Sequence, residues 1–180
     1  MQSIPRMAFA LLLALGFAIT ATPVHGDDGC IDFKWDVSKE RALFAGTPSA
    51  IKAGMDAKSA PVIVPNRLYK LRLAAPAQVT FALSPLKKKA AEGAFAGLAR
   101  LKISAAGSYR VAIDVPVWID VVSRGALVAA KDYEGQHNCS APHKIVEFEL
   151  SGAQPLILQF SNGRSENILL TVTPTPARKL

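Results

Sequence analysis

Cysteine, histidine and aromatic side chains are all scarce in this chain of 180 residues. Only two cysteines occur, Cys30 and Cys139, which excludes a disulfide-dense mini-protein. Neither a glycine-rich phosphate loop nor a Gly-x-Ser-x-Gly turn is present, so the sequence offers no motif for nucleotide phosphates and no recognisable serine nucleophile. Half of the residues are hydrophobic, which excludes intrinsic disorder and suits one domain with a single core.

Long apolar runs are missing after the first 26 residues. Those residues combine Arg6, an apolar run from Met7 to Ala21 and small residues at Val24 and Gly26, a pattern typical of a secretory signal peptide. The run is shorter than the ~20 residues of a transmembrane helix, although a signal anchor is the alternative. We expect residues 1–26 to be removed, leaving a periplasmic or secreted chain with no transmembrane span.

The two cysteines are predicted to pair with each other. They are the only thiols of a chain that we expect to enter an oxidising compartment. A Cys30–Cys139 disulfide closes a loop of about a hundred residues, for which chain entropy predicts a stabilisation of at most ~4–5 kcal/mol. We interpret this bridge as a staple of the fold.

Positive charge exceeds negative charge, with a formal net charge of +7. The bases are scattered except for Lys87, Lys88 and Lys89, which lie between Pro85 and Gly93 and are predicted to form a solvated turn. No aromatic residues are interleaved with these lysines, so we expect no nucleic-acid partner.

The chain from residue 27 to residue 173 has the pattern of an all-β domain. One short N-terminal helix is expected, capped by Asp36 and ended at Gly46. Beyond it, short runs alternate apolar and polar residues with turn residues between them. These predicted strands include residues 69–73, 78–83, 101–103, 109–113, 146–150, 156–160 and 168–172. We predict an antiparallel β-sandwich of the jelly-roll or Greek-key type with eight to ten strands, followed by a disordered tail at 174–180.

The alternation also predicts which side chains form the core. The apolar members of each strand share one face, so they are expected to be buried together. The predicted core includes Tyr109, Val111, Val146, Phe148, Leu158 and Phe160.

Several motifs resemble a group of small exported bacterial proteins that are mostly uncharacterised. The motifs are Gly107-Ser108-Tyr109-Arg110-Val111, a single cysteine before the strand that begins at Lys144, and the late strand Leu156-Ile157-Leu158-Gln159-Phe160. The first and last of these also resemble pre-peptidase C-terminal sandwich domains. The resemblance implies a β-sandwich fold and no particular activity.

Some members of that group bear the name homogentisate 1,2-dioxygenase. The enzyme of that name resembles a much larger cytoplasmic cupin whose iron is held by two histidines and one glutamate. Here only His137 and His143 follow the predicted signal peptide. The name therefore supplies an alternative rather than the leading interpretation.

The loop at residues 131–143 and the nearby Trp118 hold most of the candidate functional side chains. We select Trp118, Tyr133, His137 and His143 as candidate ligand-binding residues, and we expect no catalytic residue, metal or other cofactor. In the alternative interpretation, His137 and His143 hold iron together with a carboxylate, with Glu134 favoured and Asp132 and Glu147 also considered.

Two functions from different classes follow. The leading hypothesis is an exported, non-enzymatic β-sandwich that serves as a binding or accessory module of the cell envelope, with an unidentified envelope component, protein or glycan as partner. The alternative is a metal-dependent enzyme, such as a non-haem iron oxygenase that resembles homogentisate 1,2-dioxygenase and uses His137 and His143.

Overall fold

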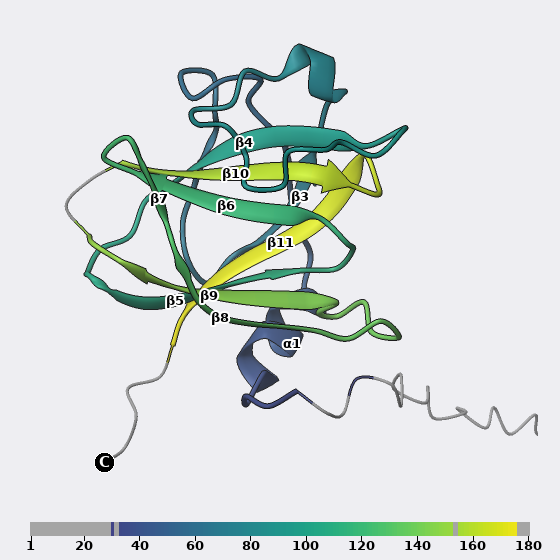
Figure 1. Cartoon of the computed structure of the whole chain (residues 1–180). Coiled ribbons are helices and arrows are strands. Elements are labelled where there is room, and N and C mark those ends of the chain that lie inside the picture. The colour runs from purple at the N-terminus through teal and green to yellow at the C-terminus, as the bar shows by residue number, and fades with distance from the viewer. Residues whose placement is uncertain (1–29, 31–32, 153–154, 176–180) are drawn as a thin grey trace, which may run out of the picture.

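The computed structural model describes residue 30, residues 33–152 and residues 155–175, and the predicted signal peptide lies outside this part of the chain. The described residues form two packed β-sheets and one α-helix (Figure 1). The first sheet contains, in spatial order, β1 (Ser49–Lys52), β3 (Leu68–Arg72), β11 (Asn167–Pro174), β5 (Gly107–Ile113), β9 (Lys144–Leu150) and β8 (Ala130–Gly135). The second contains β2 (Val62–Ile63), β4 (Phe95–Leu101), β10 (Leu156–Gly163), β6 (Trp118–Ser123) and β7 (Ala126–Val128).

The strand order is that of a jelly roll. Four consecutive strands run β3-β11-β5-β9 in one sheet and β4-β10-β6-β7 in the other, and neighbours among them are antiparallel. Successive strands of the chain cross between the sheets from β3 to β4, from β5 to β6 and from β10 to β11. The predicted β-sandwich is therefore confirmed, with the jelly-roll alternative favoured over other Greek keys.

Two outer strand pairs are parallel, so the expectation of a purely antiparallel sandwich is wrong at one edge of each sheet. β1 pairs with β3, and β2 pairs with β4, each in parallel. The chain alternates between the two sheets from β1 to β4. β2 of the other sheet therefore lies between β1 and its partner β3 in the sequence, and β3 likewise lies between β2 and its partner β4, so both members of each pair run in the same direction. The described residues also form eleven strands rather than eight to ten, because short or polar strands such as β2 and β8 carry little alternation.

The core lies between the two sheets and matches the predicted inward faces. All six residues predicted for it are at most 5% exposed. They belong to one hydrophobic cluster that contains side chains from both sheets. The alternation of each strand therefore identified its buried face correctly.

The helix α1 (Ser38–Phe44) covers the outer face of the first sheet. Val37 occupies the position before the first helical turn, and Asp36 acts from one residue further back, where its Oδ1 accepts a bond from the Ser38 amide at 2.9 Å. Val37 packs on Ala112 and Ile145, and Glu40 accepts a hydrogen bond from the Thr173 hydroxyl. No helix in the described part of the chain is long and apolar enough to cross a membrane.

The segment at residues 79–94 covers the outer face of the second sheet and is not a strand, so the strand predicted at 78–83 is wrong. A short 3-10 helix, η2 (Pro76–Gln78), precedes it. Gln159 of β10 binds its backbone on both sides: the Leu83 amide donates to Gln159 Oε1 at 3.0 Å, and Gln159 Nε2 donates to the Leu83 carbonyl at 3.1 Å. A buried side chain thus satisfies the backbone groups that a neighbouring strand satisfies elsewhere.

The last strand of the first sheet continues to residue 174. β11 includes Pro174, and the amide of Thr175 donates to the Ser108 carbonyl at 2.9 Å. The other residues of the predicted tail, 176–180, lie outside the described part of the chain.

Candidate functional site

A pocket of about 430 Å³ lies where the edge strands β7 and β8 of the two sheets approach each other. Its walls come from both sheets, with Val128 from β7, Tyr133 from β8 and Val146 and Phe148 from β9. The loop from β8 to β9 adds His137 and His143 to the lining. The pocket is of the size and mostly apolar character that small-molecule sites share.

Trp118 and Asp120 of β6 form a fixed polar pair on one wall. The indole Nε1 of Trp118 donates to Asp120 Oδ1 at 2.8 Å, and the Leu86 amide donates to Asp120 Oδ2 at 3.2 Å. Residues two apart on a strand share a face, which brings the two side chains together. Asp120 is buried, and each of its carboxylate oxygens accepts a hydrogen bond from a neighbouring group.

The mouth of the pocket carries two exposed apolar side chains. Leu86 of the covering segment is 60% exposed, and Tyr133 is 67% exposed. Few large apolar side chains of the described residues are this exposed, and these two border the same pocket. Exposed apolar surface beside a pocket is typical of a ligand-binding surface.

The disulfide and three backbone hydrogen bonds hold the loop that carries the histidines. Cys30 and Cys139 are bridged, as predicted, with their Cα atoms 5.0 Å apart. The Gln136 amide donates to the His143 carbonyl at 2.8 Å, the Cys139 amide donates to the Gln136 carbonyl at 3.2 Å, and the His143 amide donates to the Ile113 carbonyl at 2.8 Å. The bridge therefore anchors a segment of the pocket lining as well as the N-terminal segment.

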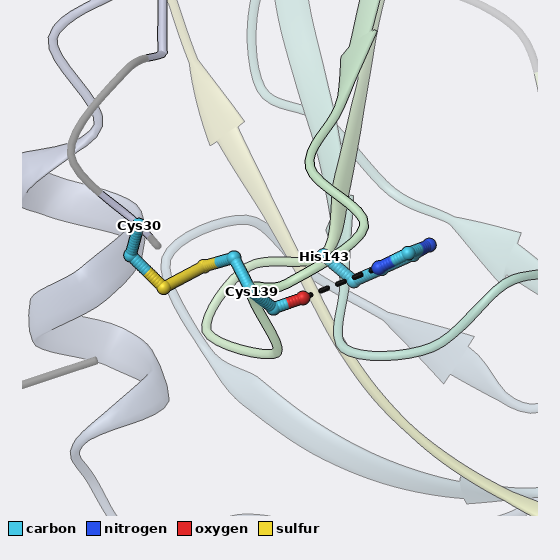
Figure 2. The surroundings of a disulfide bond; sticks show 3 residues. All are labelled: Cys30, Cys139 and His143. Atoms are coloured by element: carbon cyan, nitrogen blue, oxygen red, sulfur yellow. Dashed lines mark hydrogen bonds between the residues drawn. A yellow bond between two sulfur atoms is a disulfide. The ribbon is translucent and has the colours of Figure 1, made fainter. Parts of the chain in front are cut away.

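Both histidines border the pocket at its loop end. Figure 2 shows the disulfide leaving Cys139 on one side while the ring of His143 extends to the other, with its Nδ1 3.2 Å from the Cys139 carbonyl oxygen. The ring of His137 lies with its centroid 6.3 Å from that of His143, in an edge-to-face arrangement. Both imidazoles can therefore offer polar atoms to a ligand.

Lys144, the first residue of β9, supplies positive charge to the pocket. Its Nζ lies 5.2 Å from the centroid of the Trp118 ring. Burial lowers the pKa of this ammonium, the nearby charge of Lys87 lowers it further, and Asp120 opposes the change. Lys144 forms no ion pair with any residue of the described chain.

The residues of the iron alternative do not come together. Glu134 pairs with Ile145 in the β8–β9 register and so lies on the outer face of the sheet, whereas the histidines border the pocket. Its carboxylate accepts hydrogen bonds from the Lys34 amide at 2.8 Å and from Gln136 Nε2 at 3.2 Å. No three His, Cys, Asp or Glu side chains among the described residues are grouped so that they fit a metal ion.

The other two carboxylates of that alternative are engaged elsewhere. Asp132 Oδ1 binds Lys34 Nζ at 2.6 Å, and Glu147 is held by Arg110 and Lys131 on the outer face. Among the described residues, the two histidines and the three carboxylates of this alternative therefore do not form a two-histidine, one-carboxylate iron site.

All four side chains selected from the sequence, Trp118, Tyr133, His137 and His143, line this one pocket. Lys144 and Asp120 line it too and were not selected as ligand-binding residues. Lys144 could have been found from the sequence. It lies two and four residues before Val146 and Phe148 on the same strand, so the alternation places its charge on the inward face. Leu86 carried no comparable signal, since its segment was expected to form turns.

Comparison of this chain with protein-family models and with curated proteins finds no match. Function is accordingly inferred from the chemistry of the pocket.

Proposed function

We propose that this protein is an exported, non-enzymatic binding module of the cell envelope, and that the pocket between the β7 and β8 edges is its ligand site. One observation carries the proposal: every ligand-binding candidate selected from the sequence borders a single apolar pocket with a few convergent polar groups. The resemblance to small exported bacterial β-sandwich proteins and to pre-peptidase C-terminal domains agrees with an exported β-sandwich and implies no particular activity.

The disulfide supports the export part of the proposal. Cys30 and Cys139 are paired, and structural disulfides persist mainly in oxidising compartments such as the periplasm or the cell exterior. We expect intact-mass measurement of protein from the periplasm or culture medium to show loss of the first 26 residues and of two thiol hydrogens. Protein that retains Met1 in the membrane fraction, or that has two reactive thiols when freshly isolated, would contradict export.

The two tryptophans allow a direct test of the pocket, because each reports on a different face. Trp118 lines the pocket, whereas Trp35 packs on the outer face of the first sheet beside Arg110. The protein is labelled with ¹⁵N, and its two indole N–H signals are followed while a small-molecule fraction extracted from cell envelopes is added. We expect the Trp118 signal to move and the Trp35 signal to stay.

The same experiment tests the absence of catalysis. The bound compound is released by denaturing the protein and is compared by mass spectrometry with the compound before addition. We expect an unchanged mass, whereas conversion to a product would identify an enzyme. If neither indole signal moves with any envelope fraction, or if both move equally, the pocket is not the site of an envelope ligand.

A further inference from the structure

The ammonium of Lys144 at the pocket has no ion-pair partner among the described residues, although the Asp120 carboxylate attracts it from a longer distance. Lys144 borders an apolar cavity, contacts the Trp118 ring and forms no ion pair with the described residues. Both oxygens of the nearest acidic group that lines the pocket, Asp120, already accept hydrogen bonds from Trp118 and from the Leu86 amide. A partly buried ammonium gains most from a ligand that brings its own negative charge.

The surroundings add to this preference for an anion. Lys87 lies near enough to Lys144 to disfavour its charged form, and the imidazoles of His137 and His143 border the same end of the pocket. No arginine lines the pocket, so the planar fork that binds phosphate through two bonds is missing from the lining. Lys144 is the one lysine of the lining, and an ammonium without a guanidinium fork beside it matches a monoanion better than a phosphate dianion.

The rest of the lining is apolar. Ile119, Val128, Val146 and Phe148 form walls on both sheets, and Leu86 extends the apolar surface at the mouth. An apolar ligand body gains free energy by leaving water for such walls. The ligand must therefore combine an apolar body with one negative charge.

We infer that the pocket binds a small organic carboxylate with an apolar body, its carboxylate placed against Lys144 and its body between the β6–β7 and β8–β9 walls. This inference rests on the proposed ligand site and specifies its ligand class. The carboxylate supplies the direct ion pair that Lys144 does not form with any described residue, and Trp118 and the histidines border the same pocket.

Matched eight-carbon probes test the charge preference. Calorimetric titration of the mature protein compares octanoate, octan-1-ol and octylammonium, which share one apolar body and differ in charge. We expect octanoate to bind about ten-fold more tightly than octan-1-ol, as one charge-assisted hydrogen bond provides, and octylammonium to bind most weakly. A parallel set of 3-phenylpropanoate and 3-phenylpropan-1-ol shows whether an aromatic body serves as well as a chain.

Variants of Lys144 locate the effect. Lys144→Met keeps the apolar length and removes the charge, so the ten-fold preference for octanoate should disappear, whereas Lys144→Arg should retain most of it. The control Lys102→Met removes an exposed lysine outside the pocket and should leave the preference unchanged. Circular dichroism and urea unfolding confirm that each variant is folded.

Three outcomes overturn the inference: equal affinity for octanoate and octan-1-ol, no binding of either anion, or a preference that persists in Lys144→Met. These outcomes are distinct from failure of the proposed function. If an envelope fraction moves the Trp118 signal but no carboxylate binds, the site stands and the ligand class is wrong. If carboxylates bind and no envelope fraction does, the ligand class stands and the envelope role is wrong.

Discussion

The strand β9 carries two charged side chains three residues apart, and they lie in opposite environments. Glu147 is on the outer face, where its carboxylate is within 3.3 Å of Arg110 Nε and of Lys131 Nζ. Lys144 is on the inner face, beside the Trp118 ring and without an ion pair among the described residues. An odd separation along a strand places two residues on opposite faces, which is why one strand provides both environments.

The contrast separates a structural charge from a binding one. The Arg110 side chain that holds Glu147 also donates to the Asp36 carbonyl at 3.0 Å and stacks on Trp35, so the ion pair ties the N-terminal segment to the sheet. Lys144 forms no ion pair that connects two described segments of the chain. A charge that forms ion pairs within the protein contributes to the fold, whereas a partly buried charge that borders a pocket and forms no ion pair there is available to a ligand.

The largest effect is expected from the apolar part of the inner face of β9. Phe148 is 2% exposed, so Phe148→Ala should lower the free energy of unfolding by about 3–5 kcal/mol, through lost burial and the cavity that it leaves. Urea unfolding measures this loss. The control Val62→Ala truncates an exposed apolar residue and should change stability by less than about 0.5 kcal/mol. A Phe148→Ala loss below about 1 kcal/mol would show that this face is not the tightly packed one.

The next effect concerns the charge on the outer face. Glu147→Gln keeps the shape but removes the negative charge that faces Arg110, and both side chains of this pair are only 8% exposed. We expect a loss of about 1–3 kcal/mol in urea unfolding, because Arg110 is left without its carboxylate. Glu149→Gln, on the same face but 65% exposed, is the matched control and should lose less than about 0.5 kcal/mol. Equal losses in the two variants would remove the distinction between the faces.

The pH dependence of stability sharpens the same point. Burial alone raises the pKa of the Glu147 carboxyl. Hydrogen bonds from Lys131, Arg110 and Ser108 together outweigh burial and place this pKa below the ordinary value of 4.5. The folded state therefore binds fewer protons than the unfolded state, so the contribution is complete above pH 4.5 and is lost as the pH falls through the folded-state pKa.

Urea unfolding at pH 7 and at pH 3 tests this sign. The stability difference between the wild-type protein and Glu147→Gln should be smaller at pH 3 than at pH 7. A difference that is the same at both values would contradict a role for the charged carboxylate.

The smallest effect is expected at Lys144. Lys144→Met removes an ammonium whose charged form is disfavoured by burial and by Lys87, so stability should stay within about 0.5 kcal/mol of the wild type or rise. The measurement is the same urea titration at pH 7. A loss as large as that of Glu147→Gln would identify Lys144 as a structural charge and would erase the contrast between the two faces.

Much of the fold was predictable because strand alternation is a local property. The predicted inward faces of β5, β9 and β10 are confirmed by the burial of residues such as Val111, Phe148 and Phe160. The run at 78–83 has the same alternation but is not part of either sheet, and its Leu83 backbone is held against the second sheet by Gln159. Periodicity does not distinguish a strand from an extended cover, because both have an inner and an outer side.

Four residues of the candidate site were predictable from the sequence, but the full set of side chains that line it was not. Trp118, Tyr133, His137 and His143 were selected because aromatic and imidazole side chains carry binding chemistry, and they line one pocket. Glu134 was grouped with the histidines because it is close to them in sequence. The register of β8 on β9 places it on the other face of the sheet.

The sequence by itself determined which side chains face inward and, through its two cysteines, which loop is tied to the N-terminal segment. Only the tertiary structure decided that Lys144 of one sheet lies over Trp118 of the other, 26 residues away along the chain. The physical reason is range: side-chain alternation follows from the geometry of each strand, whereas the approach of β7 to β8 depends on how strands distant in sequence pair into sheets.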